Sequence, residues 1–303
     1  MIPTRGRRRP LDTAAVSTMV LLTFIWSFTH VATKLAAHEV SFVMQGGLRS
    51  IIAAVLLMLW ARMRGVPLFE RDGTWWPGLA AGALFAGEFF FIYAGLEYTG
   101  ASRMALFVYL APLLTAVGVH LFVPGERLEP VQWAGIGIAF AGIVVAFGEG
   151  FVADPSSLLG DAFGIVAAFM WAATTVVIRM TALSDASASK TLFYQLAVSA
   201  LLLPVASLAM GEPGVIDFSW VAASSLFYQG AVVSFASYLA WFWLLTRYLA
   251  GRLSVFSFLA PLFGVITGVM ILGEPMRPPF AIAVALVGLG IWLVNRPAAA
   301  DNG

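Results

Sequence analysis

Two charged residues lie inside long apolar stretches of the sequence, and their chemistry is the first clue to what the chain does. Arg49 falls in an apolar run over residues 41–61, and Glu88 falls in another over residues 76–96. A charge at membrane depth is costly unless it is paired or hydrated. A guanidinium binds carboxylates, whereas a carboxylate binds an amine or a proton. These residues are therefore either binding groups for a small molecule or a structural ion pair between two helices.

Four further polar residues in apolar runs can form hydrogen bonds. His30 has a side chain that titrates near neutral pH, so it would either exchange protons or hydrogen-bond to a neighbouring helix. Gln45, Gln195 and Gln229 can hydrogen-bond to a zwitterion, and they can equally join two helices.

Aromatic residues in the apolar runs indicate the walls of a binding cavity. Apolar walls with a few polar groups suit a largely hydrophobic ligand, and an ammonium group can lie over an aromatic face. We expect two or three of these side chains to line a cavity and the others to pack against helices or lipid. The candidates are Trp26, Tyr93, Tyr109, Trp171, Tyr228, Tyr238 and Trp241.

The residue types disfavour most catalytic chemistry. The chain has no cysteine, which excludes thiolate nucleophiles and thiolate metal sites. It contains no His-Glu-x-x-His motif, no Asp-rich motif and no nucleotide-binding loop. We expect no enzyme activity, no metal, no cofactor and no nucleic-acid partner. Arg49 is the single basic residue deep in an apolar run, so phosphate-bearing ligands are disfavoured as well.

The elements that must position these residues are membrane helices. Of the 303 residues 60% are hydrophobic and 11% are charged, whereas soluble proteins carry about 25% charge. A helix needs about 20 apolar residues to cross a bilayer. The sequence predicts an all-α integral membrane protein with ten spans, at residues 15–36, 41–61, 76–96, 102–122, 131–148, 160–180, 188–209, 220–245, 253–272 and 279–295.

The positive charges predict the orientation of these spans. Arginines at positions 5 and 7–9 precede the first run, as in a secretory signal, but that run is long enough to be the first span. If both termini are cytoplasmic, most of the 17 lysines and arginines lie on cytoplasmic segments. The exceptions are Lys34, Arg103, Arg277 and the intramembrane Arg49. This distribution follows the positive-inside rule.

The two halves of the sequence are diverged copies. Trp26 precedes Lys34 by eight residues, as Trp171 precedes Arg179. Leu-Ala-Pro-Leu occurs at residues 110–113 and 259–262, and Gly-Glu occurs at 125–126 and 273–274. Each copy contains five spans, an odd number, so the copies enter the membrane from opposite sides. Inverted repeats of this kind support alternating access around a midplane site.

The repeat also sets the expected domain boundaries and gates. We expect a basic segment over residues 1–14, a first repeat over 15–148, an external linker over 149–159, a second repeat over 160–296 and a cytoplasmic tail over 297–303. Pro112 and Pro261 occupy matching positions inside spans. Each removes a backbone hydrogen bond and favours a kink, which serves either gating or static curvature.

With its tryptophan-to-lysine segment, paired Leu-Ala-Pro-Leu segments and duplicated Gly-Glu, the sequence resembles the ten-helix EamA-domain members of the drug/metabolite transporter superfamily. The resemblance implies an exporter of small metabolites in a bacterial-type inner membrane, with a substrate cavity between the repeats. Members commonly carry an arginine near position 49, so a structural role is favoured for Arg49. Among such proteins the chain is most similar to bacterial exporters of aromatic amino acids.

The predicted function is secondary transport of amino acids, including aromatic and other neutral ones, with membrane lipid as the surroundings. The alternative is export of drugs or other metabolites, since Glu88 with aromatic walls would also accept a lipophilic cation. A membrane enzyme or a channel is less favoured. No ATP-binding motif is present, so the energy would come from ion or substrate gradients.

Overall fold

The computed structural model describes residues 11–147, 157–272 and 279–296, and helices dominate these residues. The first half contains α1 (Thr13–Ser27), α2 (Thr29–Leu35), α3 (Phe42–Met63), α4 (Trp75–Gly95), α5 (Ala101–Val108), α6 (Ala111–Phe122) and α7 (Pro130–Phe147). The second half contains α8 (Leu158–Met180), η3 (Ala182–Ser184), α9 (Ala188–Ala209), α10 (Trp220–Phe227), η4 (Tyr228–Ser237), α11 (Tyr238–Arg247), α12 (Ala250–Ser254), η5 (Val255–Phe258), α13 (Leu259–Leu272) and α14 (Pro279–Asn295).

These helices group into ten spans at the positions that the sequence predicts. Among the described residues, six stretches are long and apolar enough to cross a membrane: Thr13–Leu35, Phe42–Met63, Trp75–Gly95, Arg103–Phe122, Leu158–Met180 and Ala188–Ala209. The remaining four spans are α7, the α10–η4–α11 run, the η5-interrupted run from α12 to α13, and α14. The expectation of an all-α membrane protein is confirmed.

Several spans are interrupted within the membrane. Phe28 separates α1 from α2, and Tyr109 and Leu110 separate α5 from α6. Pro112 and Pro261 each lie in the first turn of the helix that follows a break or a 3-10 segment, α6 and α13 respectively. A helix tolerates proline there because the first-turn N–H groups have no partner within the helix. The break therefore precedes each proline, rather than forming a kink around it.

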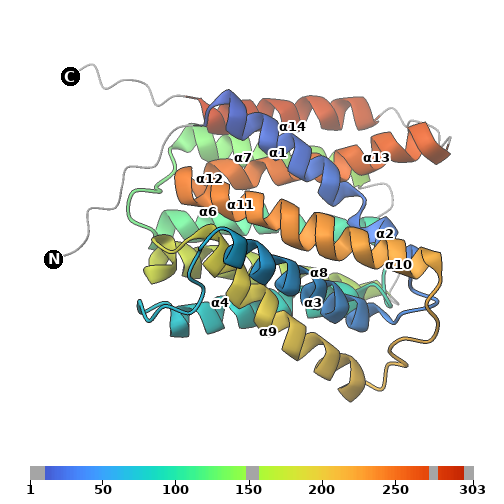
Figure 1. Cartoon of the computed structure of the whole chain (residues 1–303). Helices are drawn as coiled ribbons and strands as arrows, with labels where there is room; N and C mark the ends of the chain where they lie inside the picture. The colour runs from blue at the N-terminus through green and yellow to red at the C-terminus, as the bar shows by residue number, and fades with distance from the viewer. Residues whose placement is uncertain (1–10, 148–156, 273–278, 297–303) are drawn as a thin grey trace.

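The first helices of the two repeats run in opposite directions. The Tyr248 hydroxyl donates to Asp12, just before α1, at 2.7 Å. Arg179, near the end of α8, donates to the backbone carbonyl of Leu245 at 2.9 Å. The start of α1 and the end of α8 therefore meet the same end of α11. Figure 1 also shows the start of α1 and the end of α14 at one end of the bundle.

The second helices of the repeats, α3 and α9, are also antiparallel. Glu212, just beyond α9, accepts hydrogen bonds from the backbone N–H groups of Val43 at 3.1 Å and Met44 at 3.2 Å, in the first turn of α3. A carboxylate at this position satisfies free N–H donors and interacts favourably with the helix dipole. The two contacts, at α1–α8 and α3–α9, agree with an inverted repeat.

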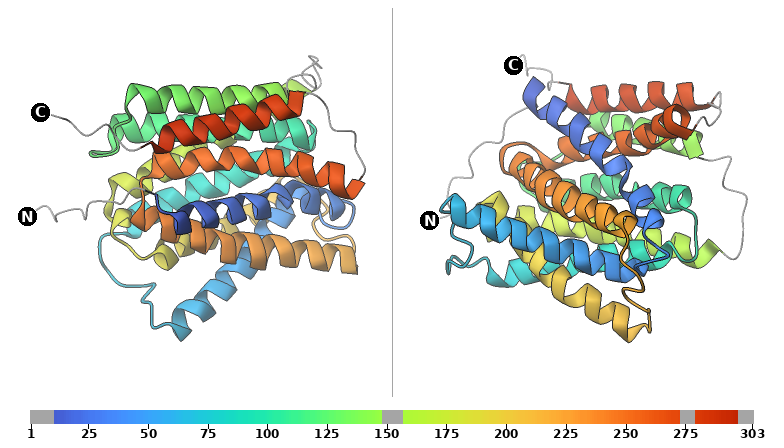
Figure 2. Two further views of the ribbon diagram at one scale, coloured as in Figure 1. Left: turned by 90° about the horizontal axis from the view of Figure 1, so that it is seen from above. Right: turned by 45° about the vertical axis from the view of Figure 1, so that its right-hand side comes forward.

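Small residues allow the central helices to pack closely. The α4–α8, α3–α9 and α7–α14 pairs make the most extensive contacts, and α7 and α14 lie side by side in Figure 2. A Cβ atom added to Gly82 on α4 would lie 2.7 Å from Val198 on α9 and 2.8 Å from the Tyr194 carbonyl oxygen. This close packing encloses a cavity between the repeats.

Candidate functional site

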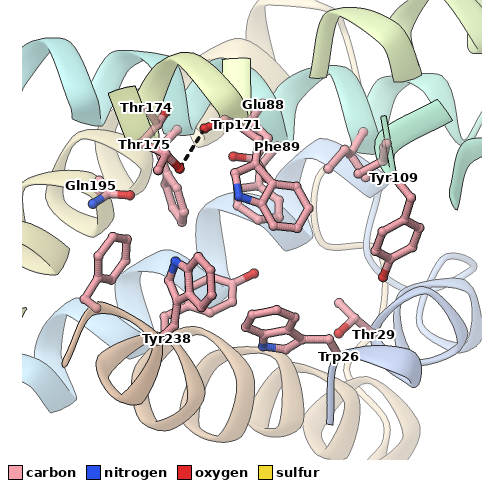
Figure 3. Close-up of a pocket in the computed structure, with 15 residues that line it drawn as sticks. Trp26, Thr29, Glu88, Phe89, Tyr109, Trp171, Thr174, Thr175, Gln195 and Tyr238 are labelled. Carbon is pink, nitrogen blue, oxygen red and sulfur yellow. Dashed lines mark hydrogen bonds between the residues drawn. The ribbon is translucent and has the colours of Figure 1, made fainter. Parts of the chain in front are cut away.

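A cavity of about 90 Å³ lies between the two repeats. Both repeats contribute to its lining, and Figure 3 shows these side chains converging from several helices. The lining residues are Trp26, Thr29, Phe85, Glu88, Phe89, Ile92, Val108, Tyr109, Trp171, Thr174, Thr175, Gln195, Tyr238, Trp241 and Phe242. Apolar walls with a few polar groups are typical of small-molecule sites.

One face of α4 forms the charged part of the cavity. Phe85, Glu88, Phe89 and Ile92 all line it. Their spacing of three and four residues places them on a single helix face. Phe85 and Phe89 pack edge to face, with ring centroids 4.8 Å apart. The helix therefore presents one carboxylate between aromatic rings.

Glu88 is the only acidic side chain among the described lining residues, which include no lysine, arginine or histidine. Its side chain is 5% exposed. Among the described residues its carboxylate makes no ion pair, so the alternative of a structural Arg49–Glu88 ion pair is not found. A buried carboxylate in apolar surroundings is stabilised by binding a proton or a cation. The geometry leaves that position open to a ligand.

The second repeat supplies the facing aromatic wall. Tyr238, Trp241 and Phe242 come from α11, and Trp171 comes from α8. Trp26 of the first repeat packs edge to face against Tyr238 and Trp241, with centroids 6.2 Å and 5.8 Å away. Five of the seven aromatic candidates line the cavity, more than the two or three expected: Trp26, Tyr109, Trp171, Tyr238 and Trp241.

Arg49 lies behind this wall instead of lining the cavity. Its guanidinium carbon is 3.7 Å from the centroid of the Phe89 ring, 5.6 Å from that of Tyr93 and 5.9 Å from that of Tyr238. The residue is fully buried. None of its three side-chain nitrogens makes a hydrogen bond to the described residues. Aromatic faces stabilise the charge, but they leave its N–H donors unsatisfied.

Gln45 and Gln229 join helices instead of facing the cavity. The Gln229 amide donates to Gln45 Oε1 at 2.9 Å. Gln229 Oε1 accepts from the hydroxyls of Tyr93 at 2.8 Å and Thr33 at 3.3 Å. This network links α2, α3, α4 and η4. The side-chain amides of Gln45 and Gln229 are hydrogen-bonded within this network, so of the two roles that the sequence suggests, joining helices fits them better than binding a ligand.

The remaining candidates divide between the cavity and the packing around it. Gln195 lines the cavity; its amide nitrogen donates to the Thr191 carbonyl at 3.1 Å, and its Oε1 has no partner among the described residues. Tyr228 donates its hydroxyl to the Ile25 carbonyl oxygen. His30 lies in α2, but its side chain is outside the described residues.

The profile of the EamA-like transporter family matches this sequence twice, over residues 13–148 and 158–296. The chain belongs to the EamA-like transporter family. The two matches together span most of the chain, one in each half. The expected membership of the drug/metabolite transporter superfamily is therefore confirmed, whereas the resemblance to aromatic amino-acid exporters stays a prediction.

Similar proteins cover most of this EamA-like transporter. An uncharacterized transporter of Archaeoglobus fulgidus is 27% identical, covering 91% of this chain and 96% of its own. A probable amino-acid metabolite efflux pump of Escherichia coli is 24% identical, covering 90% and 92%. A solved crystal structure superposes with a TM-score of 0.79 at 23% identity, over 95% of this chain and 99% of that one. That last match shows the shared fold.

Sequence reasoning missed several lining residues of this transporter that helix periodicity could have found. Phe85 and Phe89 lie three residues before and one after Glu88 on the same face. Thr174 and Thr175 follow Trp171 by three and four residues. Extending the faces of the named candidates along each helix would have included them. Which face turns inward, however, depends on packing against the other repeat.

Proposed function

We propose that this EamA-like transporter exports small, partly apolar metabolites that carry an amino group, amino acids among them, in exchange for protons. The observation that carries the proposal is the lone Glu88 carboxylate among aromatic rings at the repeat interface. An ammonium group can pair with the carboxylate and lie against the rings. The substrate's apolar part then fills the rest of the cavity.

Proton exchange follows from the burial of Glu88. An uncompensated carboxylate at membrane depth is unfavourable, so Glu88 holds either a proton or the substrate ammonium. Binding of one displaces the other at a single site. If the site reaches each side of the membrane in turn through the inverted repeat, substrate moves outward as protons move inward.

The relatives support amino-acid-type compounds as the substrate class, because the Escherichia coli protein is named a probable amino-acid metabolite efflux pump. A second candidate is an exporter of lipophilic amines. The absence of a cation among the described lining residues favours it, since a free carboxylate on the substrate would find no partner in the cavity.

Uptake into liposomes that contain the purified protein tests the proposal. Labelled phenylalanine and leucine represent aromatic and aliphatic amino acids, and labelled phenethylamine represents an amine without a carboxylate. Saturable uptake of the amino acids supports amino-acid transport. Uptake of phenethylamine alone supports the second candidate. If folded protein carries none of the three compounds, the proposal is wrong.

We also propose that both termini lie in the cytoplasm of a bacterial-type inner membrane, as the positive charges indicate. The chain has no native cysteine, so single cysteines report their side directly. Asp185 lies after η3 and Asp217 lies before α10, and both are exposed. A membrane-impermeant maleimide added to intact cells should label Asp217→Cys and leave Asp185→Cys unlabelled. The reverse pattern would contradict this orientation.

A further inference from the structure

Arg49 is a buried cation whose surroundings leave its hydrogen-bonding capacity unused. Its relative exposure is 0%, and Nε, Nη1 and Nη2 have no hydrogen-bond partner among the described residues. A guanidinium carries five N–H donors, and an unpaired buried charge is unfavourable in a low-dielectric interior. Three aromatic rings surround it and the Tyr238 hydroxyl lies near it, but no carboxylate among the described residues pairs with it. The site has the charge, the geometry and the free donors that a carboxylate requires.

One aromatic layer separates Arg49 from the cavity. Phe89 and Tyr238 both line the cavity, and the guanidinium carbon of Arg49, which does not line it, lies 3.7 Å and 5.9 Å from their ring centroids. Their rings are stacked, with centroids 6.3 Å apart and an interplanar angle of 30°. Phe89 also follows Glu88 directly in α4. A ligand whose amine binds Glu88 would therefore need to pass only this pair of rings to reach Arg49.

The helix that carries Tyr238 has the geometry of a movable element. Tyr238 begins α11 directly after η4, a π-helix of 10 residues. π-Helical turns are uncommon and occur frequently at functional sites. If one wide turn becomes α-helical, the residues after it shift by one position, about 100° around the helix axis. Such a shift would turn the Tyr238 ring away from Phe89 and Arg49.

The same π-helix packs directly on α3 at Arg49. A Cβ atom added to Gly230 of η4 would lie 2.8 Å from Ile52 and 3.3 Å from the Arg49 carbonyl oxygen. The π-helix therefore contacts the backbone of the residue whose side chain Tyr238 covers. A change from π-helical to α-helical geometry in η4 would therefore affect both Arg49 and the Tyr238 ring beside it.

We infer that Arg49 is the carboxylate subsite of the transport site, closed in this structure by Phe89 and Tyr238. The inference rests on the proposed function and narrows it. The substrate is a zwitterion with an apolar side chain, whose ammonium group binds Glu88 and whose carboxylate binds Arg49. An amine without a carboxylate would bind Glu88 alone. Arg49 thus determines the preference for substrates with a carboxylate. Phe89 and Tyr238 separate its guanidinium from the cavity when no carboxylate is bound.

Equilibrium binding of three compounds to the purified transporter tests the subsite. Phenylalanine, phenylalaninamide and phenethylamine share an amine and a benzyl group, but only the first has a carboxylate. The wild-type protein should bind phenylalanine about 10- to 100-fold more tightly than either other compound, the range expected for hydrogen bonds between charged groups. Equal affinities would overturn the subsite, and this comparison needs no variant.

Variants extend the test to the residue itself. Arg49→Gln should reduce phenylalanine affinity to that of phenylalaninamide and leave phenethylamine binding within about twofold of wild type. Arg49→Lys should retain part of the preference, because it keeps the charge without the planar fork. Retention of the full preference in Arg49→Gln would overturn the assignment. If the wild type binds and transports none of the compounds, the proposed function fails instead, so the two failures are distinguishable.

Discussion

Arg179 and Glu126 form a buried ion pair at the end of the bundle where α1 begins. Both side chains are less than 5% exposed. Arg179 also donates to the Leu245 carbonyl, and Glu126 accepts from the backbone N–H of Ala250 at 2.9 Å, at the start of α12. The pair therefore ties the α6–α7 loop and α8 to both sides of the α11–α12 turn.

Removal of one partner of this pair should strongly destabilise the protein. Arg179→Ala leaves the Glu126 carboxylate buried without its cation, which costs about 3–5 kcal/mol. The free energy of unfolding in detergent micelles measures the loss. Arg247→Ala is the matched control, since Arg247 is exposed at the same end of α11, and it should change stability by less than about 0.5 kcal/mol. Equal effects of the two variants would contradict a structural role for the pair.

The internal repeat predicted which residues matter at this end, but not that they meet. Arg179 stands out as the counterpart of Lys34, and Glu126 as the counterpart of Glu274, which lies outside the described residues. Their contact joins positions 53 residues apart, so it depends on how the repeats pack. Local signals do not contain that information.

The spans were predictable because lipid requires long apolar helices, whereas the irregular geometry inside them was not. The runs at 188–209 and 279–295 match α9 and α14 residue for residue. The π-helix η4 and the Tyr109 break interrupt equally apolar runs. Side-chain partners are equally hard to predict: the sequence suggests Glu88 as a partner for Arg49, but the Arg49 guanidinium stacks on Phe89, the residue that follows Glu88 in α4.

Close packing of α4 on α9 should not tolerate a side chain at Gly82. Gly82→Ala places a Cβ atom within 2.8 Å of the Tyr194 carbonyl oxygen, and overpacking of this kind costs about 1–3 kcal/mol. Gly137→Ala is the same change on α7, where no atom lies within 4 Å of the new Cβ. It should keep or raise stability, by up to about 1 kcal/mol. Thermal unfolding of both variants measures the difference in stability. Equal unfolding midpoints would contradict the close contact between α4 and α9 at Gly82.

Asp72 should contribute stability that is lost in acid. Lys190 and Thr74 donate hydrogen bonds to its carboxylate, at 2.8 Å and 2.6 Å. The bond from Lys190, followed by that from Thr74, lowers the pKa of Asp72 from 3.8 to about 2. A lowered pKa stabilises the fold above the unfolded-state value, and this contribution disappears as pH falls from about 4 to about 2.

The variant Asp72→Asn tests this pH dependence. Its unfolding midpoint should be lower than that of wild type at pH 7, and the difference should shrink below pH 4. Because Asp72 is partly exposed, added salt should also reduce the difference. A difference that is independent of pH would show that the ionised carboxylate is not the stabilising group.

Two glutamines should respond differently to the same substitution. Gln195→Leu removes a cavity-lining amide whose Oε1 has no partner in the part of the chain that the structure describes. It should raise KM about 10-fold, equivalent to one hydrogen bond to a charged group. Gln45→Leu breaks the link to Gln229 and leaves its partners unsatisfied, which should lower stability by about 1–3 kcal/mol. Transport kinetics together with thermal unfolding separate the two roles. An unchanged KM in Gln195→Leu would remove it from the substrate site.

The central claim is that Glu88 binds substrate and proton in turn, and proton-driven accumulation tests it most directly. Liposomes containing the transporter are loaded at acid pH and diluted into alkaline buffer with labelled phenylalanine. Glu88→Gln removes the charge without changing the shape of the side chain, and Glu97→Gln is the control, since Glu97 is exposed beyond the end of α4. Wild type and Glu97→Gln should accumulate phenylalanine above its external concentration, whereas folded Glu88→Gln should not. Accumulation by Glu88→Gln equal to that of wild type would contradict the account.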